Sequence, residues 1–275
     1  MGIGRFLRRR RSGAGREGLR QTFQDAFLPR KRRPTVAELR ARANAAVRAR
    51  HGGEVAFGEF AGLRLSDDPW WGGLDASAKI LGAYESQVVR EVAALSGRGR
   101  MLVDIGAADG FFAVGALVGN LFDRVTAFEI SDRGRAALTA VARLNGVENR
   151  IDIQAEADAA ALARVVGANP DAVVLCDIEG AEFDLFDDAL LATLAGCSVI
   201  IELHGPFDAD GAGRRHDLRA RALRHFDCRL LHRDPIPVDA FDALADLDDA
   251  TRLLAFGEGR KRRGEWLVLT PRAAT

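Results

Sequence analysis

Short apolar runs alternate with helix-like segments from Met101 to the end of the chain, and this alternation most constrains the fold. Seven runs have the length and the Val, Ile and Leu content of strands: MLVDI, RVTAFEI, RIDIQA, AVVLCDIE, SVIIELH, FDCRLLH and EWLVLT. Continuous apolar runs suit strands covered on both faces, and strands that alternate with helices form mainly parallel sheets. The sequence therefore predicts an α/β fold with a doubly wound, seven-stranded, mainly parallel sheet.

The residues before this sheet have a different organisation. Residues 1–34 are rich in Arg and Gly without an apolar stripe, which predicts a basic, disordered tail. TVAELRARANAAVRAR predicts a helix with Thr35 as its N-cap, and ASAKILGAYESQVVREVAALSG predicts a second helix that ends at Gly97. The expected domains are the tail, a helical extension over 35–97 and the α/β domain over 98–275.

The charge of the chain is unevenly distributed. The formal net charge is zero, yet residues 1–53 contain 15 Arg and Lys against three acids. Such a basic segment either is a solvated tail or makes weak contact with an anionic membrane. No run reaches the roughly 20 apolar residues that span a bilayer, and the three cysteines lie far apart. We expect a cytoplasmic protein with free thiols.

The stretch LVDIGAADGFF, from Leu102, joins the first predicted strand to the next helix. Ligands of open parallel sheets bind beyond the carboxyl ends of the strands. Gly106 and Gly110 predict a sharp turn at which a ligand approaches the backbone. Because Ala108 and Phe111 replace the second and third glycines of G-x-G-x-x-G, the pattern disfavours NAD, and G-x-x-x-x-G-K-[ST] is absent too.

An acid, Glu129, follows the second predicted strand. A carboxylate at this position can accept two hydrogen bonds from a ribose diol without any phosphate partner. Together with the glycine-containing turn, Glu129 favours S-adenosylmethionine as the ligand.

These residues resemble a known family. LVDIGAADGFFAVG, VTAFEIS, LNGVENRI, and LCDIEGAEFDLF followed by VIIELHG are similar to the FkbM-type branch of class I S-adenosylmethionine-dependent methyltransferases, over about residues 80–204. The resemblance implies a Rossmann-like fold, S-adenosylmethionine as cofactor, and O-methylation of a hydroxyl on a small molecule or glycan. Many relatives carry Asn and an apolar residue where this chain has Ala108 and Asp109, so the methionine contacts stay open.

The same resemblance assigns cofactor contacts by position. It places Asp104 and Gly106 at the methionine end, with Ala107 and Gly110 in the same turn, and Glu129 on the ribose hydroxyls. Asp158 either contacts the adenine amine or is the N-cap of the following helix.

Ionisable residues follow the fourth and fifth predicted strands. Because strand side chains alternate, Asp177 and Glu179 share one face, as do Glu202 and His204. In methyl transfer to oxygen, His204 would be the general base, with Glu202 orienting it. Alternatively, Asp177 and Glu202 bind a divalent metal such as Mg²⁺, which the sequence leaves open. In a purely structural interpretation, Glu179 and Glu182 cap the next helix.

Two other functions remain open. The first is an RNA methyltransferase, although the positive charge lies on a tail and no NPPY-like tetrad follows the fourth strand, so nucleic acid is disfavoured as a partner. The second is a noncatalytic module that binds the cofactor or a partner. The sequence does not specify the methyl acceptor, the need for a metal or the oligomeric state.

Overall fold

The computed structural model describes residues 32–71, 73–205, 209–233, 235, 241–258, 260 and 264–272. Its chain divides into two compact units, residues 1–36 and residues 37–275. The predicted disordered tail at 1–34 lies almost entirely outside the described residues. All of the sheet belongs to the second unit.

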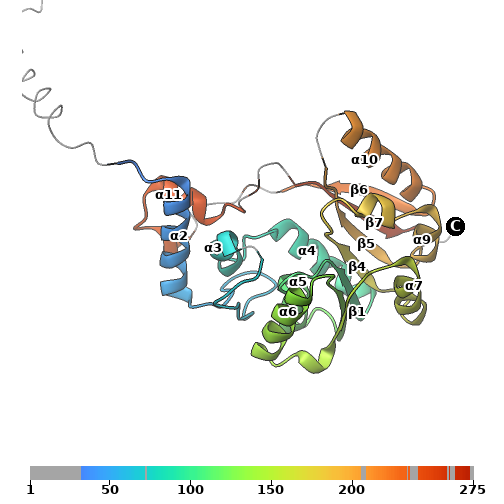
Figure 1. The fold of residues 1–275 in the computed structure, drawn as a ribbon, viewed down its shortest axis with the longest axis horizontal. Helices are drawn as coiled ribbons and strands as arrows, with labels where there is room; N and C mark the ends of the chain where they lie inside the picture. Colours follow the sequence, from blue (N-terminus) through green and yellow to red (C-terminus); the bar gives the residue numbers. More distant parts are fainter. Residues whose placement is uncertain are drawn as a thin grey trace, which may run out of the picture. The chain divides into compact units, whose positions relative to one another are not determined.

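One seven-stranded sheet forms the centre of this unit (Figure 1). Its strands are β1 Met101–Ile105, β2 Arg124–Phe128, β3 Ile151–Gln154, β4 Val173–Cys176, β5 Ser198–Glu202, β6 Phe226–Leu231 and β7 Trp266–Pro271. The spatial order is β3-β2-β1-β4-β5-β7-β6, and only β7 runs antiparallel to its neighbours. All seven predicted strands are therefore confirmed, as is the doubly wound α/β fold.

Helices cover both faces of the sheet, which explains the uninterrupted apolar runs. Consecutive residues of a strand point to opposite faces: Leu102 and Val103 are both fully buried but belong to different core clusters. The helices of the first cluster are α4 Ser86–Leu95, α5 Phe111–Val118 and α6 Asp132–Leu144. Those of the second are α7 Ala159–Ala168, α8 Glu182–Leu185, α9 Asp188–Thr193 and α10 Ala209–Ala222. The buried strand side chains thus pack against helices on both faces of the sheet.

The helical extension differs from its prediction in one respect. The first helix forms, as α2 Val36–His51, but the second is interrupted between α3 Ala76–Ile80 and α4. At the break, Gly82 and Glu85 have positive φ angles of 65° and 44°, which no α-helix contains. A Cβ on Gly82 would lie 2.1 Å from the carbonyl oxygen of Phe57. The apolar spacing concealed this break because the helices on both sides of it are buried.

Two further segments complete the fold. The single helix expected from EFDLFDDALLATL is divided into α8 and α9, because Asp187 caps a new helix through its contact with the Leu190 amide at 2.8 Å. The described part of residues 235–264 contains a 3-10 turn, Asp242–Leu244, and α11 Asp249–Ala255. Leu244 and Phe256 of this segment pack in one hydrophobic cluster with residues of α2. Figure 1 shows α11 beside α2.

Other expectations concern the cysteines and the membrane. Cys176, Cys197 and Cys228 are free thiols, as predicted. None of the helices in the described segments combines the length and the apolar character that crossing a membrane requires.

Candidate functional site

A cavity of about 710 Å³ opens at the carboxyl ends of β1, β2 and β4. The strand order reverses between β1 and β4, and this is where open parallel sheets bind their ligands. Five of the six residues assigned to the cofactor by resemblance lie on its wall: Asp104, Gly106, Ala107, Glu129 and Asp158. The volume suits a nucleoside-sized ligand.

The glycines of the turn serve packing between protein segments. A Cβ on Gly106 would lie 1.9 Å from the carbonyl oxygen of Asp177, and a Cβ on Gly110 would lie 2.3 Å from Leu138. Both glycines have φ angles near 90°, and Ala108 between them also has a positive φ of 48°. Gly106 therefore lets β1 and the end of β4 meet, and Gly110 lets the turn pack against α6.

Glu129 is held rigidly in the cavity wall. Its side chain is almost completely buried, and its two oxygens accept hydrogen bonds from the Ala108 amide at 2.9 Å and the Ser131 amide at 2.8 Å. A Cβ on Gly134 would collide with Glu129 and with Trp70, so that glycine makes room for both. Each carboxylate oxygen keeps a second lone pair, which lets the fixed group accept a hydrogen bond from a diol.

Asp104 lies at the centre of the same wall and is 2% exposed. Its Oδ2 has no hydrogen-bond partner among the residues that the structure describes. Burial, reinforced by the nearby charges of Asp177 and Glu129, raises the pKa of Asp104 to about 7. An unpaired buried carboxylate is costly, so this oxygen is a strong acceptor for a ligand donor.

The far end of the cavity is acidic and partly aromatic. Asp158 lines it and is also the N-cap of α7, with its Oδ1 2.6 Å from the Ala161 amide. The position of Asp158 is thus compatible with both interpretations, the contact with the adenine amine and the helix N-cap. Trp70 and the half-exposed Trp71 line the same cavity, with ring centroids 5.8 Å apart. Of the cofactor candidates, Gly110 alone is not on the cavity wall.

His204 brings the polar residues after β4 and β5 together. Its Nε2 lies 3.4 Å from Asp177, 3.7 Å from Glu179 and 3.7 Å from Glu202. β4 and β5 are paired neighbours, so all four residues expected from the sequence converge. Asp177 and Glu179 also line the cavity, which connects this cluster to the turn after β1.

Glu182 lies on the other side of the His204 ring. This fully buried carboxylate accepts hydrogen bonds from the His204 amide at 2.7 Å and the Gly180 amide at 2.8 Å. Its Oε1 is 3.5 Å from His204 Nδ1, an electrostatic contact rather than a normal hydrogen bond. Glu182, more than Glu202, is therefore the acid placed to orient the ring.

The cluster shifts its own protonation equilibria. Burial lowers the pKa of His204, but the facing carboxylates of Glu182, Asp177 and Glu179 raise it above its ordinary value overall. Burial raises the pKa of Asp177 to about 6, against the opposing effect of His204. For Glu182, burial is outweighed by the hydrogen bonds from His204, which lower its pKa. The titrations of His204 and Asp177 are therefore coupled, while Glu182 stays ionised beside them.

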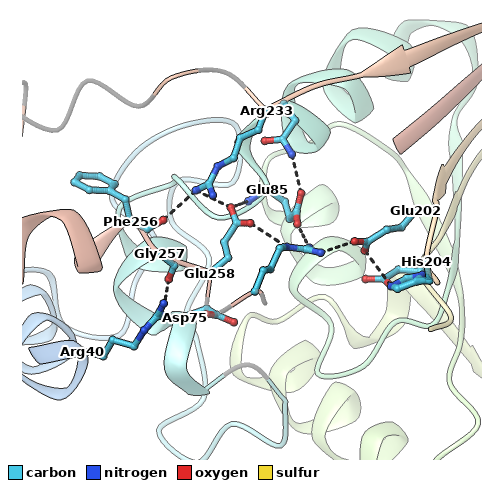
Figure 2. Close-up of polar contacts among 12 residues, drawn as sticks. Arg40, Asp75, Glu85, Glu202, His204, Arg233, Phe256, Gly257 and Glu258 are labelled. Atoms are coloured by element: carbon cyan, nitrogen blue, oxygen red, sulfur yellow. Dashed lines mark hydrogen bonds and ion pairs between the residues drawn. The ribbon is translucent and has the colours of Figure 1, made fainter. Parts of the chain in front are cut away.

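Glu202 is tied to a second network (Figure 2). Burial and the neighbouring Asp177 raise the pKa of Glu202. The guanidinium of Arg260 pairs with Glu202, with Glu85, and with Glu258 at 3.1 Å. Arg233 extends the network to Glu258 at 2.9 Å. Glu85 therefore belongs to this network.

Asp177, Glu179 and His204 also have the composition of a cation site. Their donor atoms lie within 4.8 Å of one another. The metal alternative expected from the sequence used Asp177 and Glu202, whereas the structure directs Glu202 toward Arg260.

Sequence reasoning missed three charged residues. Lys79 lies on α3 and lines the cavity, and Asp109 pairs with it at 3.5 Å. Arg260 lies 58 positions after its partner Glu202. Lys79 is the one lysine among apolar residues in ASAKILGAY, which was the available signal.

Comparison with protein-family models and with curated proteins finds no match. Among solved structures, an O-methyltransferase from Bacillus cereus in complex with SAH matches at 12% identity and a TM-score of 0.44, covering 92% of this chain and 97% of that one. The C-terminal domain of precorrin-6Y C5,15-methyltransferase from Rhodobacter capsulatus matches at 19% identity and a TM-score of 0.42, covering 66% and 86%. Similarity at this level carries no functional argument.

Proposed function

We propose that the protein is an S-adenosylmethionine-dependent methyltransferase of the FkbM type, which methylates a hydroxyl on a small molecule or glycan in the cytoplasm. The observation that carries the proposal is a single cavity that is lined at one side by cofactor-binding candidates and at the other by the candidate catalytic carboxylates. Glu129 and Asp104, whose Oδ2 has no hydrogen-bond partner in the described part of the chain, line its cofactor half, and the carboxylates of Asp177 and Glu179 beside His204 line the other half.

The described residues fit this cofactor. The fixed carboxylate of Glu129 would accept from the ribose hydroxyls, and Asp104 would accept from the ammonium group. When bound, S-adenosylmethionine supplies a methyl group on a sulfonium sulfur. The cofactor itself is cationic at that sulfur, and the acidic wall stabilises positive charge.

His204 would remove the proton from the acceptor hydroxyl. The ionised Glu182 faces Nδ1 and favours the tautomer that keeps its proton there, which leaves the Nε2 lone pair toward Asp177 and the cavity. Asp177 stabilises the imidazolium that forms when Nε2 accepts the proton. Glu179 lies in the loop after β4 with a positive φ of 54°, and its carboxylate adds negative charge beside the same nitrogen.

The charge of the cavity favours a neutral acceptor over a polyanion. Among the residues that the structure describes, nine acids and one lysine line it. A nucleic-acid backbone would bring phosphates toward these carboxylates, so an RNA acceptor is disfavoured. The grouping of Asp177, Glu179 and His204 supports one variation of the proposal, in which a divalent cation held there activates the hydroxyl.

Calorimetric titration with S-adenosylhomocysteine tests the proposal before the acceptor is known. We expect binding, and we expect Glu129→Ala to weaken it by about 1–3 kcal/mol through the loss of charge-assisted hydrogen bonds. The exposed acid Glu148 lies outside the cavity, so Glu148→Ala is the matched control and should bind normally. Absence of binding heat in the wild type would refute the proposal.

Transfer of a labelled methyl group to hydroxyl compounds, glycans and RNA then addresses the reaction. His204→Ala should retain S-adenosylhomocysteine binding and lose transfer. If His204→Ala and the wild type transfer equally, His204 is not the base. A protein that binds the cofactor product but methylates none of the three classes would support the noncatalytic alternative.

A further inference from the structure

A buried lysine borders the cofactor half of the cavity. Lys79 is 5% exposed, although lysine is almost never fully buried unless paired. Its Nζ lies 5.2 Å from the ring centroid of Tyr84 and 5.4 Å from that of Phe111. The two aromatic faces stabilise the ammonium but cannot replace the hydrogen bonds that it loses from water.

The ion pair of Lys79 with Asp109 is too long to be a normal hydrogen bond. Asp109 Oδ2 is 3.5 Å from Nζ, which is within ion-pair range and beyond the ordinary length of an N–H···O bond. An ammonium has three donors. Lys79 and Asp109 both line the cavity, so a ligand in it can reach the lysine.

Asp104 supplies the opposite charge on the same cavity wall. It is 2% exposed, and its Oδ2 is unpartnered among the described residues. Among the residues that the structure describes, the cavity wall therefore presents a buried ammonium held by one long ion pair and a buried carboxylate oxygen without a hydrogen-bond partner. A ligand group that carries both an ammonium and a carboxylate would satisfy both at once.

We propose that Lys79 completes a subsite for an α-amino acid head group: Lys79 Nζ, beside Asp109, binds the α-carboxylate, while the α-ammonium lies at Asp104 Oδ2, the contact already given in the proposed function. This inference rests on the proposed function, where the head group is the methionine part of the cofactor. It makes α3 of the helical extension part of the cofactor site. The aromatic rings of Tyr84 and Phe111 fix the lysine for this contact.

Two ligands separate the subsite from the rest of the cavity. S-adenosylhomocysteine carries the amino acid head, and 5′-methylthioadenosine has the same adenosine and thioether without it. We expect the wild type to bind S-adenosylhomocysteine at least 10-fold more tightly. Lys79→Met should weaken S-adenosylhomocysteine binding about 10- to 100-fold and change 5′-methylthioadenosine binding less than twofold. Asp104→Asn should discriminate in the same direction.

The control is Arg42→Met, which removes an exposed cation of α2 that does not line the cavity. It should leave both affinities unchanged. If Lys79→Met fails to fold, Asp104→Asn carries the test.

The outcomes distinguish this subsite from the proposed function. Equal loss of both ligands in Lys79→Met and in Asp104→Asn, or equal affinity of the wild type for both, would overturn the subsite and leave the methyltransferase proposal standing. If the wild type binds neither ligand, the proposed function itself fails. Retained 5′-methylthioadenosine binding shows that a variant is folded, so selective loss of S-adenosylhomocysteine supports the subsite.

Discussion

The carbonyl oxygen of Asp177 lies where a side chain on Gly106 would have to begin, 1.9 Å from the position of its Cβ. The turn after β1 and the end of β4 are therefore packed backbone against backbone, and the cofactor half of the cavity depends on the position of Asp177, which lines the other half and contacts His204. A displacement at Gly106 would move Asp177 together with the turn.

Gly106→Ala should lower the free energy of unfolding by more than the cost of a positive φ alone. Gly146→Ala is the matched control, because Gly146 has a φ of 68° and open space around its Cβ position. The control should cost about 1–2 kcal/mol, the price of left-handed backbone for an L-residue. Urea unfolding of both variants measures the difference. Equal losses would show that the turn yields easily to the new Cβ.

Asp104 should make the protein less stable as the pH rises from about 4 to about 7. Its pKa is raised from 3.8 to about 7 in the folded state, so the folded chain binds more protons than the unfolded chain in this window. The free energy of unfolding therefore falls with increasing pH. Asp104→Asn should flatten this decline in urea unfolding measured at pH 4.5, 6 and 7.5, whereas Glu148→Gln should not. An unchanged slope in Asp104→Asn would contradict the shift.

The His204 imidazole should titrate above its ordinary pKa of 6.5, because Glu182, Asp177 and Glu179 face it. Asp177→Asn removes one of these charges and should lower the His204 pKa. Nuclear magnetic resonance of the imidazole protons follows this titration without any acceptor. In turnover, the neutral base accumulates as the pH rises, so the rate should increase through the same pKa and shift to lower pH in Asp177→Asn. A shift in the opposite direction would contradict the assigned contacts.

Arg260→Leu should cost about 3–5 kcal/mol at pH 8, because it leaves Glu85, Glu202 and Glu258 buried without their shared cation. The loss should shrink at pH 5, because burial raises the pKa of both Glu202 and Glu258 and protonation removes the negative charge left behind. Arg100→Leu is the control, since Arg100 pairs with Asp123 at the surface and such pairs contribute about 0–1 kcal/mol. Equal effects of the two variants on urea unfolding would show that the network around Arg260 is not rigid.

The local pattern of the sequence determined the sheet. Strands covered on both faces need continuous apolar runs, and Leu102 and Val103 show why, since both are buried in separate clusters. Parallel strands place their carboxyl ends at one edge, so the convergence of Asp177 and His204 also followed from the sequence.

Tertiary structure alone decided contacts between residues distant in the chain. The break at Gly82 brings this glycine against the Phe57 carbonyl. Glu182 faces Nδ1 of the His204 ring, whereas Glu202 lies near Nε2 and also pairs with Arg260, 58 positions later in the chain. Lys79, on α3, reaches Asp109 in the turn after β1. Apolar periodicity records whether a residue is buried, but it does not record which buried charge it meets, because pairing depends on distance in space and not on spacing in the chain.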